Sequence, residues 1–163
     1  MPSDRRPRLI LHCDGAARGN PGPAGIGVEI TDEDGEVVAE IAEGIGVATN
    51  NVAEYTAAIR GLERARELDA THVLLRSDSR LLIEQLAGRW KVKNPTLQRL
   101  HREARSLISE FEQVRFEHVR RERNVEADAL ANRGVDEWLA GDGSSWERSP
   151  PSPRLWEPGE EPR

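Results

Sequence analysis

Four acidic residues stand at positions where folding could bring them together: Asp14, Glu54, Asp78 and Asp128. Two of them end predicted strands and two fall in the opening turns of predicted helices, and reactive groups collect at the carboxyl ends of strands in α/β sheets. Carboxylates that lie close together repel one another and raise each other's pKa values, so such a cluster needs cations. Hard divalent ions with oxygen ligands, Mg²⁺ or Mn²⁺ as its substitute, suit it. Two such ions can activate a water and stabilise the leaving oxygen of a phosphodiester.

Each acid by itself also has a purely structural interpretation. Asp14 could form an Asx turn with the glycine that follows it. Glu54 could complete a capping box with the asparagine three residues earlier. Asp78 could cap a helix, and Asp128 could be a favourable charge in a first helical turn. These interpretations remain open for each residue, but they leave the local sequences around the acids unexplained.

The chain alternates between strand and helix patterns. Strands are predicted at 8–14, in two segments of 25–47 joined at Asp34-Gly35, at 71–78 and at 113–119. Helices are predicted at 49–68 with an asparagine start, at 79–88, at 94–111 and at 124–140 with Asn124 as N-cap. A Gly/Pro-rich loop is predicted at 15–24. The early strands should form an antiparallel meander, and the later ones should join through right-handed crossovers. The predicted fold is α/β: a mixed five-stranded sheet, three antiparallel strands and then parallel ones, flanked by helices.

The length of 163 residues suits one domain and a tail. We expect the domain at 1–140. The segment 141–163 holds five of the ten prolines and no periodic pattern, so we expect a Pro-rich flexible tail. The single cysteine fits a reducing compartment, and no apolar run is long enough to cross a bilayer. We therefore expect a cytoplasmic protein without a membrane partner, and by default a monomer.

The charge is unevenly distributed along the chain. The net charge is −6, which by itself argues against a nucleic-acid partner. Residues 29–43 carry seven acids and no base, whereas residues 89–105 carry six bases and one acid, and three arginines follow at 120, 121 and 123. Each block by itself could be a solvated face. Together they allow a polarised molecule that holds a polyanion on one side.

Four local sequences carry a family resemblance: DGAARGNPGPAGIG at 14–27, TNNVAE at 49–54, SDS at 77–79 and NVEADALAN at 124–132. In their order and spacing, from Leu9 to Val135, they resemble type 1 ribonuclease H. The resemblance implies the ribonuclease H fold and hydrolysis of the RNA strand of RNA–DNA hybrids, with 5′-phosphate and 3′-hydroxyl products. It also implies that the four acids are the catalytic, metal-binding residues, which hold two Mg²⁺ ions.

The resemblance assigns substrate contacts on the RNA side. Asn20, Asn50 and Asn51 match family positions that face the RNA strand in the minor groove, where 2′-hydroxyls distinguish RNA from DNA. Gly15 would let the backbone approach that strand. Helix capping is the alternative role for Asn50 and Asn51, and it does not exclude contact with substrate.

On the DNA side, Thr49 and Asn94 match positions that line the family's pocket for a phosphate. Trp90 resembles an aromatic residue of the DNA-binding channel. The alternative for Trp90 is an anchor in the core or at an edge.

The sequence departs from the family pattern in two places. The basic protruding helix of better-known bacterial members is missing, because RWKVK alone separates Gly88 from Asn94. We expect weaker hybrid binding and a shallower salt dependence than in enzymes with that helix. Many members also place a mobile histidine before the last helix, where this chain has RRER at 120–123. We hypothesise that one of these arginines contacts the scissile or a neighbouring phosphate.

Two other function classes stay open at this level. One is another nuclease of the ribonuclease H superfamily, although editing exonucleases generally show Asp-x-Glu on the first strand and Asp14 is followed by Gly-Ala. The other is a catalytically silent nucleic-acid-binding module, which the presence of all four acids disfavours.

Overall fold

The computed structural model describes residues 7–141 and places five strands in one mixed sheet. The strands are β1 (Arg8–Ala17), β2 (Gly22–Thr31), β3 (Val37–Ala48), β4 (His72–Ser77) and β5 (Gln113–His118), in the order β3-β2-β1-β4-β5. The pairs among β1, β2 and β3 are antiparallel, and β4 lies parallel to both β1 and β5. This confirms the predicted sheet. The expected tail lies outside the described residues, apart from Gly141.

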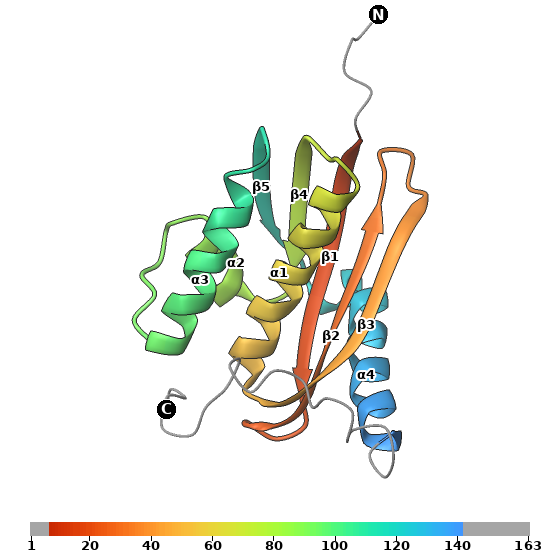
Figure 1. The fold of residues 1–163 in the computed structure, drawn as a ribbon, viewed down its shortest axis with the longest axis vertical. Helices are drawn as coiled ribbons and strands as arrows, with labels where there is room; N and C mark the ends of the chain where they lie inside the picture. Colours follow the sequence, from red (N-terminus) through yellow and green to blue (C-terminus); the bar gives the residue numbers. More distant parts are fainter. Residues whose placement is uncertain (1–6, 142–163) are drawn as a thin grey trace, which may run out of the picture.

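Helices cover both faces of the sheet (Figure 1). They are α1 (Asn50–Glu67), α2 (Arg80–Leu86), α3 (Pro95–Ile108) and α4 (Val125–Ala140), with a short 3₁₀ turn, η1 (Arg121–Arg123), before α4. α1 packs on β1 and β2 with α3 beside it, whereas α4 crosses the opposite face over β1, β2 and β3. Within residues 7–141 no helix combines the length and the apolar character that a bilayer crossing requires.

The predicted loop at 15–24 was wrong at both ends. β1 continues to Ala17 and β2 begins at Gly22, so only residues 18–21 form the turn. Of the glycines that suggested a loop, Gly19 lies in the turn at φ 107°, but Gly15 and Gly22 are paired residues of the sheet, opposite Ile26 and Ala48. Gly15 allows the close approach of α1, and a single sequence does not distinguish a glycine with that role from a glycine in a turn. The predicted hairpin at Asp34-Gly35 is confirmed, with Gly35 at φ 85°.

The core lies mainly between the sheet and α1. Alternate residues of β1 such as Leu11 and Cys13 face α1 and are fully buried. The α1 surface opposite them is built from small residues, and a side chain at Gly61 would come within 3.0 Å of Leu11. Small residues let helix and sheet approach closely, so apolar area is removed from water at about 25 cal/mol per Å². Tight packing here fixes where the first turn of α1 lies relative to β1.

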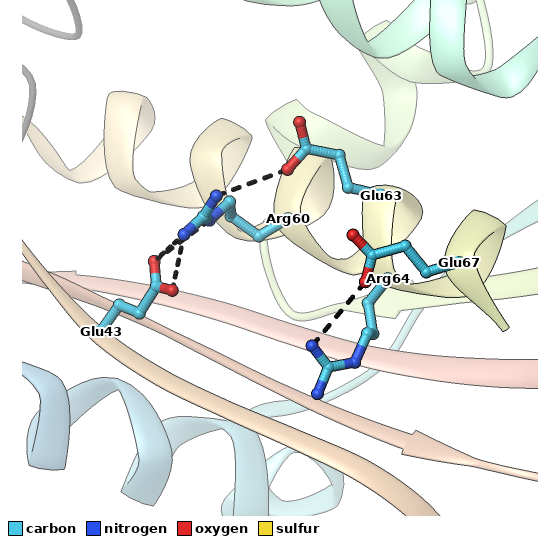
Figure 2. A network of polar contacts seen from close by, with 5 residues as sticks. All are labelled: Glu43, Arg60, Glu63, Arg64 and Glu67. Carbon is cyan, nitrogen blue, oxygen red and sulfur yellow. Dashed lines mark hydrogen bonds and ion pairs between the residues drawn. The ribbon is translucent and has the colours of Figure 1, made fainter.

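Ion pairs lie along the exposed side of α1, and one of them joins this helix to the edge strand β3 (Figure 2). Arg60 binds both oxygens of Glu43, with Nη2 at 2.6 Å from each. The same guanidinium lies 3.5 Å from Glu63, one turn along α1. Arg64 and Glu67 form a looser pair at 3.9 Å. Each carboxylate of this group, the α1–β3 ion-pair network, therefore faces a guanidinium.

The connection between α2 and α3 is a short, well-fastened loop in place of a protruding helix. Buried Glu84 binds Arg80 and Arg89 and accepts the backbone N–H groups of residues 89 and 90 through its own carbonyl. Gln85 donates to the carbonyl of Lys91 at 2.9 Å. The loop is held against α2, which agrees with the missing basic protrusion noted in the sequence.

Candidate active site

Asp14 and Glu54 are brought together by the packing of α1 on Gly15. A Cβ at Gly15 would lie 2.3 Å from the backbone carbon of Ala53, so only glycine allows this contact. The contact places Glu54 next to β1, where its Oε1 accepts the Gly15 N–H at 3.0 Å. Asp14 and Gly15 are both strand residues, so the Asx-turn alternative is wrong. The capping-box alternative is also excluded, because Thr49 is the N-cap of α1 and Glu54 lies in the second turn.

A second close approach brings Asp128 to Asp14 from the other face. Gly27 lies directly opposite Asp14 in the β1–β2 ladder, and a Cβ there would lie 2.2 Å from the carbonyl oxygen of Ala127. α4 therefore lies on Gly27, and the carboxyl group of Asp128 is close enough to that of Asp14 to raise its pKa. The sequence analysis did not predict this contact, although the signal for it is present: Gly25 and Gly27 lie two residues apart on one strand face, and both lie under α4.

Asp78 follows the end of β4, the parallel neighbour of β1. Cys13 and Ser77 are register partners, so the residues after them reach the same edge of the ladder. Ser79, and not Asp78, is the N-cap of α2, and its hydroxyl accepts the Leu82 N–H at 3.2 Å. The helix-cap alternative for Asp78 is therefore wrong.

The carboxylates gather into one cluster. Ligand oxygens of Asp14, Glu54 and Asp78 all lie within 4.8 Å of one another. Asp128 raises the pKa of Asp14 but is not a member of this tightest group. We call the four residues the carboxylate cluster.

Burial and mutual repulsion disfavour the charged forms in this cluster. Burial, then the charge of Asp78 and the contact with Asp128, raise the pKa of Asp14 from 3.8 to about 8. Burial also raises the pKa values of Glu54 and Asp78. Two influences oppose this: the Gly15 N–H and the charge of Arg121 lower the pKa of Glu54, and Arg121 lowers that of Asp78.

The donor set fits divalent magnesium or manganese. Several carboxylate oxygens converge within one small volume, and no neutralising lysine or arginine forms an ion pair with Asp14, Glu54 or Asp78 among residues 7–141. Mg²⁺ and Mn²⁺ bind in proteins at sites of this kind, where several carboxylate oxygens converge without a neighbouring positive charge.

Asn124 contributes a contact that sequence reasoning missed. It stands at the N-cap position of α4, as predicted, but its side chain makes no capping hydrogen bond. Instead its Nδ2 donates to the carbonyl of Cys13 at 2.9 Å, and its backbone carbonyl accepts the Asp128 N–H. The side chain thus joins α4 to β1 beside Asp14. A local capping signal contains no information on this long-range partner.

The predicted RNA-side residues meet at the β1–β2 turn. Asn20 Oδ1 accepts the backbone N–H of Asn50 at 3.0 Å, and Asn50 Oδ1 accepts that of Ala17 at 3.1 Å. In both side chains the amide oxygen accepts a hydrogen bond from the protein backbone, so the NH₂ group remains as a donor. Asn51 is half-buried on the next residue of α1.

The predicted DNA-side residues cap two helices. Thr49 Oγ1 accepts the N–H of Val52, and Asn94 Oδ1 accepts that of Leu97. These helices, α1 and α3, begin at the same end of the molecule (Figure 1). Trp90 is 46% exposed, so it is a surface residue and not a core anchor.

Comparison with known proteins connects this arrangement to a family. A family model described as reverse transcriptase-like matches residues 12–134. A bifunctional protein of Mycobacterium tuberculosis is 47% identical over 130 residues, which cover 79% of this chain and 36% of that protein. Ribonuclease HI of Halobacterium salinarum is 45% identical over 134 residues, with 82% and 67% coverage. The chain thus spans about a third of the length of the mycobacterial relatives it matches.

Solved structures agree with the sequence matches. The N-terminal RNase H domain of the mycobacterial protein has a TM-score of 0.78 at 47% identity, covering 79% of this chain and 99% of that domain. A ribonuclease H1 isolated from compost by a metagenomic approach, solved in complex with an RNA/DNA hybrid, has a TM-score of 0.78 at 43% identity, covering 81% and 99%.

Proposed function

The chain belongs to the type 1 ribonuclease H family, and on that premise we propose that it is an endonuclease that hydrolyses the RNA strand of RNA–DNA hybrids. The observation that carries this proposal is the convergence of the carboxylate cluster. Ligand oxygens of three of its members come within 4.8 Å of one another from β1, α1 and the end of β4. A related solved protein binds an RNA/DNA hybrid, which supports the same substrate class.

The proposed reaction is a two-metal-ion hydrolysis that leaves 5′-phosphate and 3′-hydroxyl ends. Two Mg²⁺ ions, held by Asp14, Glu54, Asp78 and Asp128, would activate the attacking water and stabilise the leaving oxygen. The chain's own part is to hold the carboxylates in place: Gly15 N–H fixes one oxygen of Glu54, and Asn124 joins α4 to β1. Pre-positioned groups avoid the entropy cost of assembling the site at each turnover.

Discrimination for RNA would come from the orientation of the asparagines. Asn20 and Asn50 use their carbonyl oxygens within the protein, so each presents an amide donor to the substrate. A 2′-hydroxyl oxygen accepts such a donor, and DNA lacks that oxygen. Asn51 on the same helix turn and the side-chain-free backbone at Gly15 would contact the same strand.

The DNA strand would be held at the starts of two helices. Thr49 and Asn94 keep a hydroxyl hydrogen and an NH₂ group free after capping α1 and α3, and helix N-termini attract phosphate. Trp90 offers an exposed ring for contact with the sugar–base edge of this strand.

The test is cleavage of a labelled substrate panel by the purified chain. We expect cleavage of the RNA strand of an RNA–DNA hybrid with Mg²⁺ or Mn²⁺, no cleavage of duplex DNA or duplex RNA, and none with EDTA. Product ends are read by susceptibility to phosphatase and by ligation. Asp78→Asn serves as the inactive control.

Other outcomes identify the alternatives. Cleavage of single-stranded or duplex DNA would indicate another nuclease of the superfamily. Binding of the hybrid without cleavage under every metal condition would indicate a silent binding module. Either result would overturn the proposal.

A further inference from the structure

The loop 89–93, between α2 and α3, has little packing of its own. Of its side chains only that of Val92 is partly buried against the core, and the others are exposed. A surface cleft of about 300 Å³ lies beside the loop, lined by Trp90, Val92 and residues of α3 such as His101. The position of the loop therefore depends on the hydrogen-bond partners of its backbone.

One buried side chain makes the central contact with this loop. Gln85 on α2 is only 5% exposed, and its Nε2 donates to the Lys91 carbonyl at 2.9 Å. The other end of the same amide, Oε1, lies 2.6 Å from the hydroxyl of Tyr55. Because a backbone carbonyl can only accept, the NH₂ group of Gln85 must face Lys91 and its oxygen must face the phenol. The direction of the network is thus fixed: Tyr55 donates to Gln85, and Gln85 donates to the loop.

Tyr55 connects this network to the active site. It directly follows Glu54 on α1 and is fully buried. From α3, His101 Nε2 donates to the backbone carbonyl of Gln85 at 3.1 Å, and its ring lies edge-on to that of Tyr55. Gln85 is therefore held by groups from two other helices. It relates the position of the loop to the part of α1 that carries Glu54.

We propose that Gln85 is a positioning residue, which sets the place of Trp90 relative to the carboxylate cluster so that both strands of one hybrid are bound at once. Trp90 immediately precedes the residue whose carbonyl Gln85 holds. A displaced loop would weaken contact with the DNA strand and would leave the carboxylates in place, so binding should suffer more than the chemical step. This inference rests on the proposed function and assigns a further residue to it.

Two variants break the network at different steps. Gln85→Glu keeps the size of the side chain and the acceptor for Tyr55, but it sets a carboxyl oxygen against the Lys91 carbonyl. Tyr55→Phe removes only the hydroxyl that orients Gln85. Thr56→Val is the matched control, because it removes a buried hydroxyl from the next residue of α1, and that hydroxyl bonds only to the Val52 carbonyl within the helix.

The first experiment is limited trypsin digestion of the chain without metal or nucleic acid, read by mass spectrometry. The loop 89–93 contains three exposed sites after Arg or Lys, and local opening governs their cleavage. We expect cleavage there to be about three- to tenfold faster in Gln85→Glu, the size expected for one buried hydrogen bond, and less accelerated in Tyr55→Phe. Thr56→Val should match the unmodified chain. Cleavage within η1 is the internal reference and should stay unchanged.

Unchanged cleavage of the loop in Gln85→Glu, or an equal acceleration in η1, would overturn the positioning role. The first result would show that Gln85 does not hold the loop. The second would show a general loss of stability.

The second experiment measures steady-state hybrid cleavage. We expect Gln85→Glu to raise KM about three- to tenfold with kcat within about twofold, whereas Thr56→Val should change neither. In the Trp90→Ala background the same change should raise KM by no more than about twofold, because the residue that Gln85 positions is absent. A fall in kcat, or the full rise in KM without Trp90, would overturn the proposal. If the unmodified chain cleaves no hybrid, the proposed function fails, while the digestion still decides whether Gln85 holds the loop.

Discussion

Acidic side chains are concentrated in two regions of this molecule. In one region they are exposed and paired with arginines, and in the other they are close to one another and more buried. In the α1–β3 ion-pair network, Glu43, Glu63 and Glu67 each lie within 4.0 Å of a guanidinium. Their side chains are 33–65% exposed, so water screens them as well (Figure 2). In the carboxylate cluster, the acids face one another and Asp14 is only 4% exposed.

This difference in pairing and burial indicates that the two regions have different roles, one in stability and one in function. Paired, exposed acids cost little to ionise and contribute little, typically below about 1 kcal/mol per pair. Buried acids without cations disfavour their own charge and weaken the metal-free fold at neutral pH. A protein retains such a cluster where the missing positive charge is to be supplied by a ligand.

The largest expected contrast between the regions is in catalysis. Asp14→Asn removes a central carboxylate of the cluster at nearly constant size, and we expect hybrid cleavage to fall by about a thousandfold or more. Glu43→Gln removes a paired carboxylate and should leave the rate within about twofold. Single-turnover cleavage measures both. Comparable losses in the two variants would remove the functional distinction between the regions.

The next contrast is in the pH dependence of stability without metal. The folded pKa of Asp14, about 8, lies above its ordinary value of 3.8, so folding favours the protonated carboxyl. Its contribution is fully present below pH 3.8 and is lost as the pH rises through about 8. We expect the free energy of unfolding in EDTA to fall by about 1–3 kcal/mol between about pH 5 and pH 9.

Asp14→Asn is the control for that titration, because its amide cannot ionise. The variant should keep more of its stability at alkaline pH and should exceed the unmodified chain there, as measured by urea unfolding. A parallel pH dependence in both proteins would show that the loss comes from other groups.

Metal addition should reverse the alkaline loss. At about pH 8, Mg²⁺ at ten to a hundred times its dissociation constant should stabilise the chain by about 1.4–2.7 kcal/mol, because it binds the folded state. Thermal unfolding with and without Mg²⁺ measures the effect. Asp14→Asn should gain less, whereas Glu43→Gln should gain as much as the unmodified chain. An equal gain in Asp14→Asn would place the stabilising ion elsewhere.

The smallest expected effect belongs to the paired region. Glu43→Gln should lower the free energy of unfolding by about 0.2–1 kcal/mol at low salt, since Arg60 loses its bidentate partner. The loss should shrink toward zero at about 1 M salt, where exposed charges are screened. Urea unfolding at the two salt concentrations tests this. A loss that does not change with salt would mean that packing, and not charge, joins α1 to β3 at this point.

Much of the fold could be predicted from periodicity, because apolar spacing depends on residues within one element. Helices α1 and α4 and the hairpin at Asp34-Gly35 lie where the pattern placed them. The prediction of a loop at 15–24 failed at its ends: Gly15, a residue typical of a turn, is a ladder residue covered by α1. The sequence also predicted that Asn124 caps α4, because its position at the start of the helix can be read from local sequence. Its actual partner, the Cys13 carbonyl on β1, is distant in sequence and could not be predicted in this way.

The sequence by itself determined the identity of the four acids and the family, because their flanking motifs are local and specific in combination. Only the tertiary structure decided how those acids interact. The contacts of α1 with Gly15 and of α4 with Gly27 join segments far apart in the chain, and they set the distances on which charge repulsion depends. The same long-range packing directs the oxygens of Asn20 and Asn50 toward backbone N–H groups of the protein. Residue type fixes which interactions a side chain can make, whereas the fold fixes which partners lie within their range.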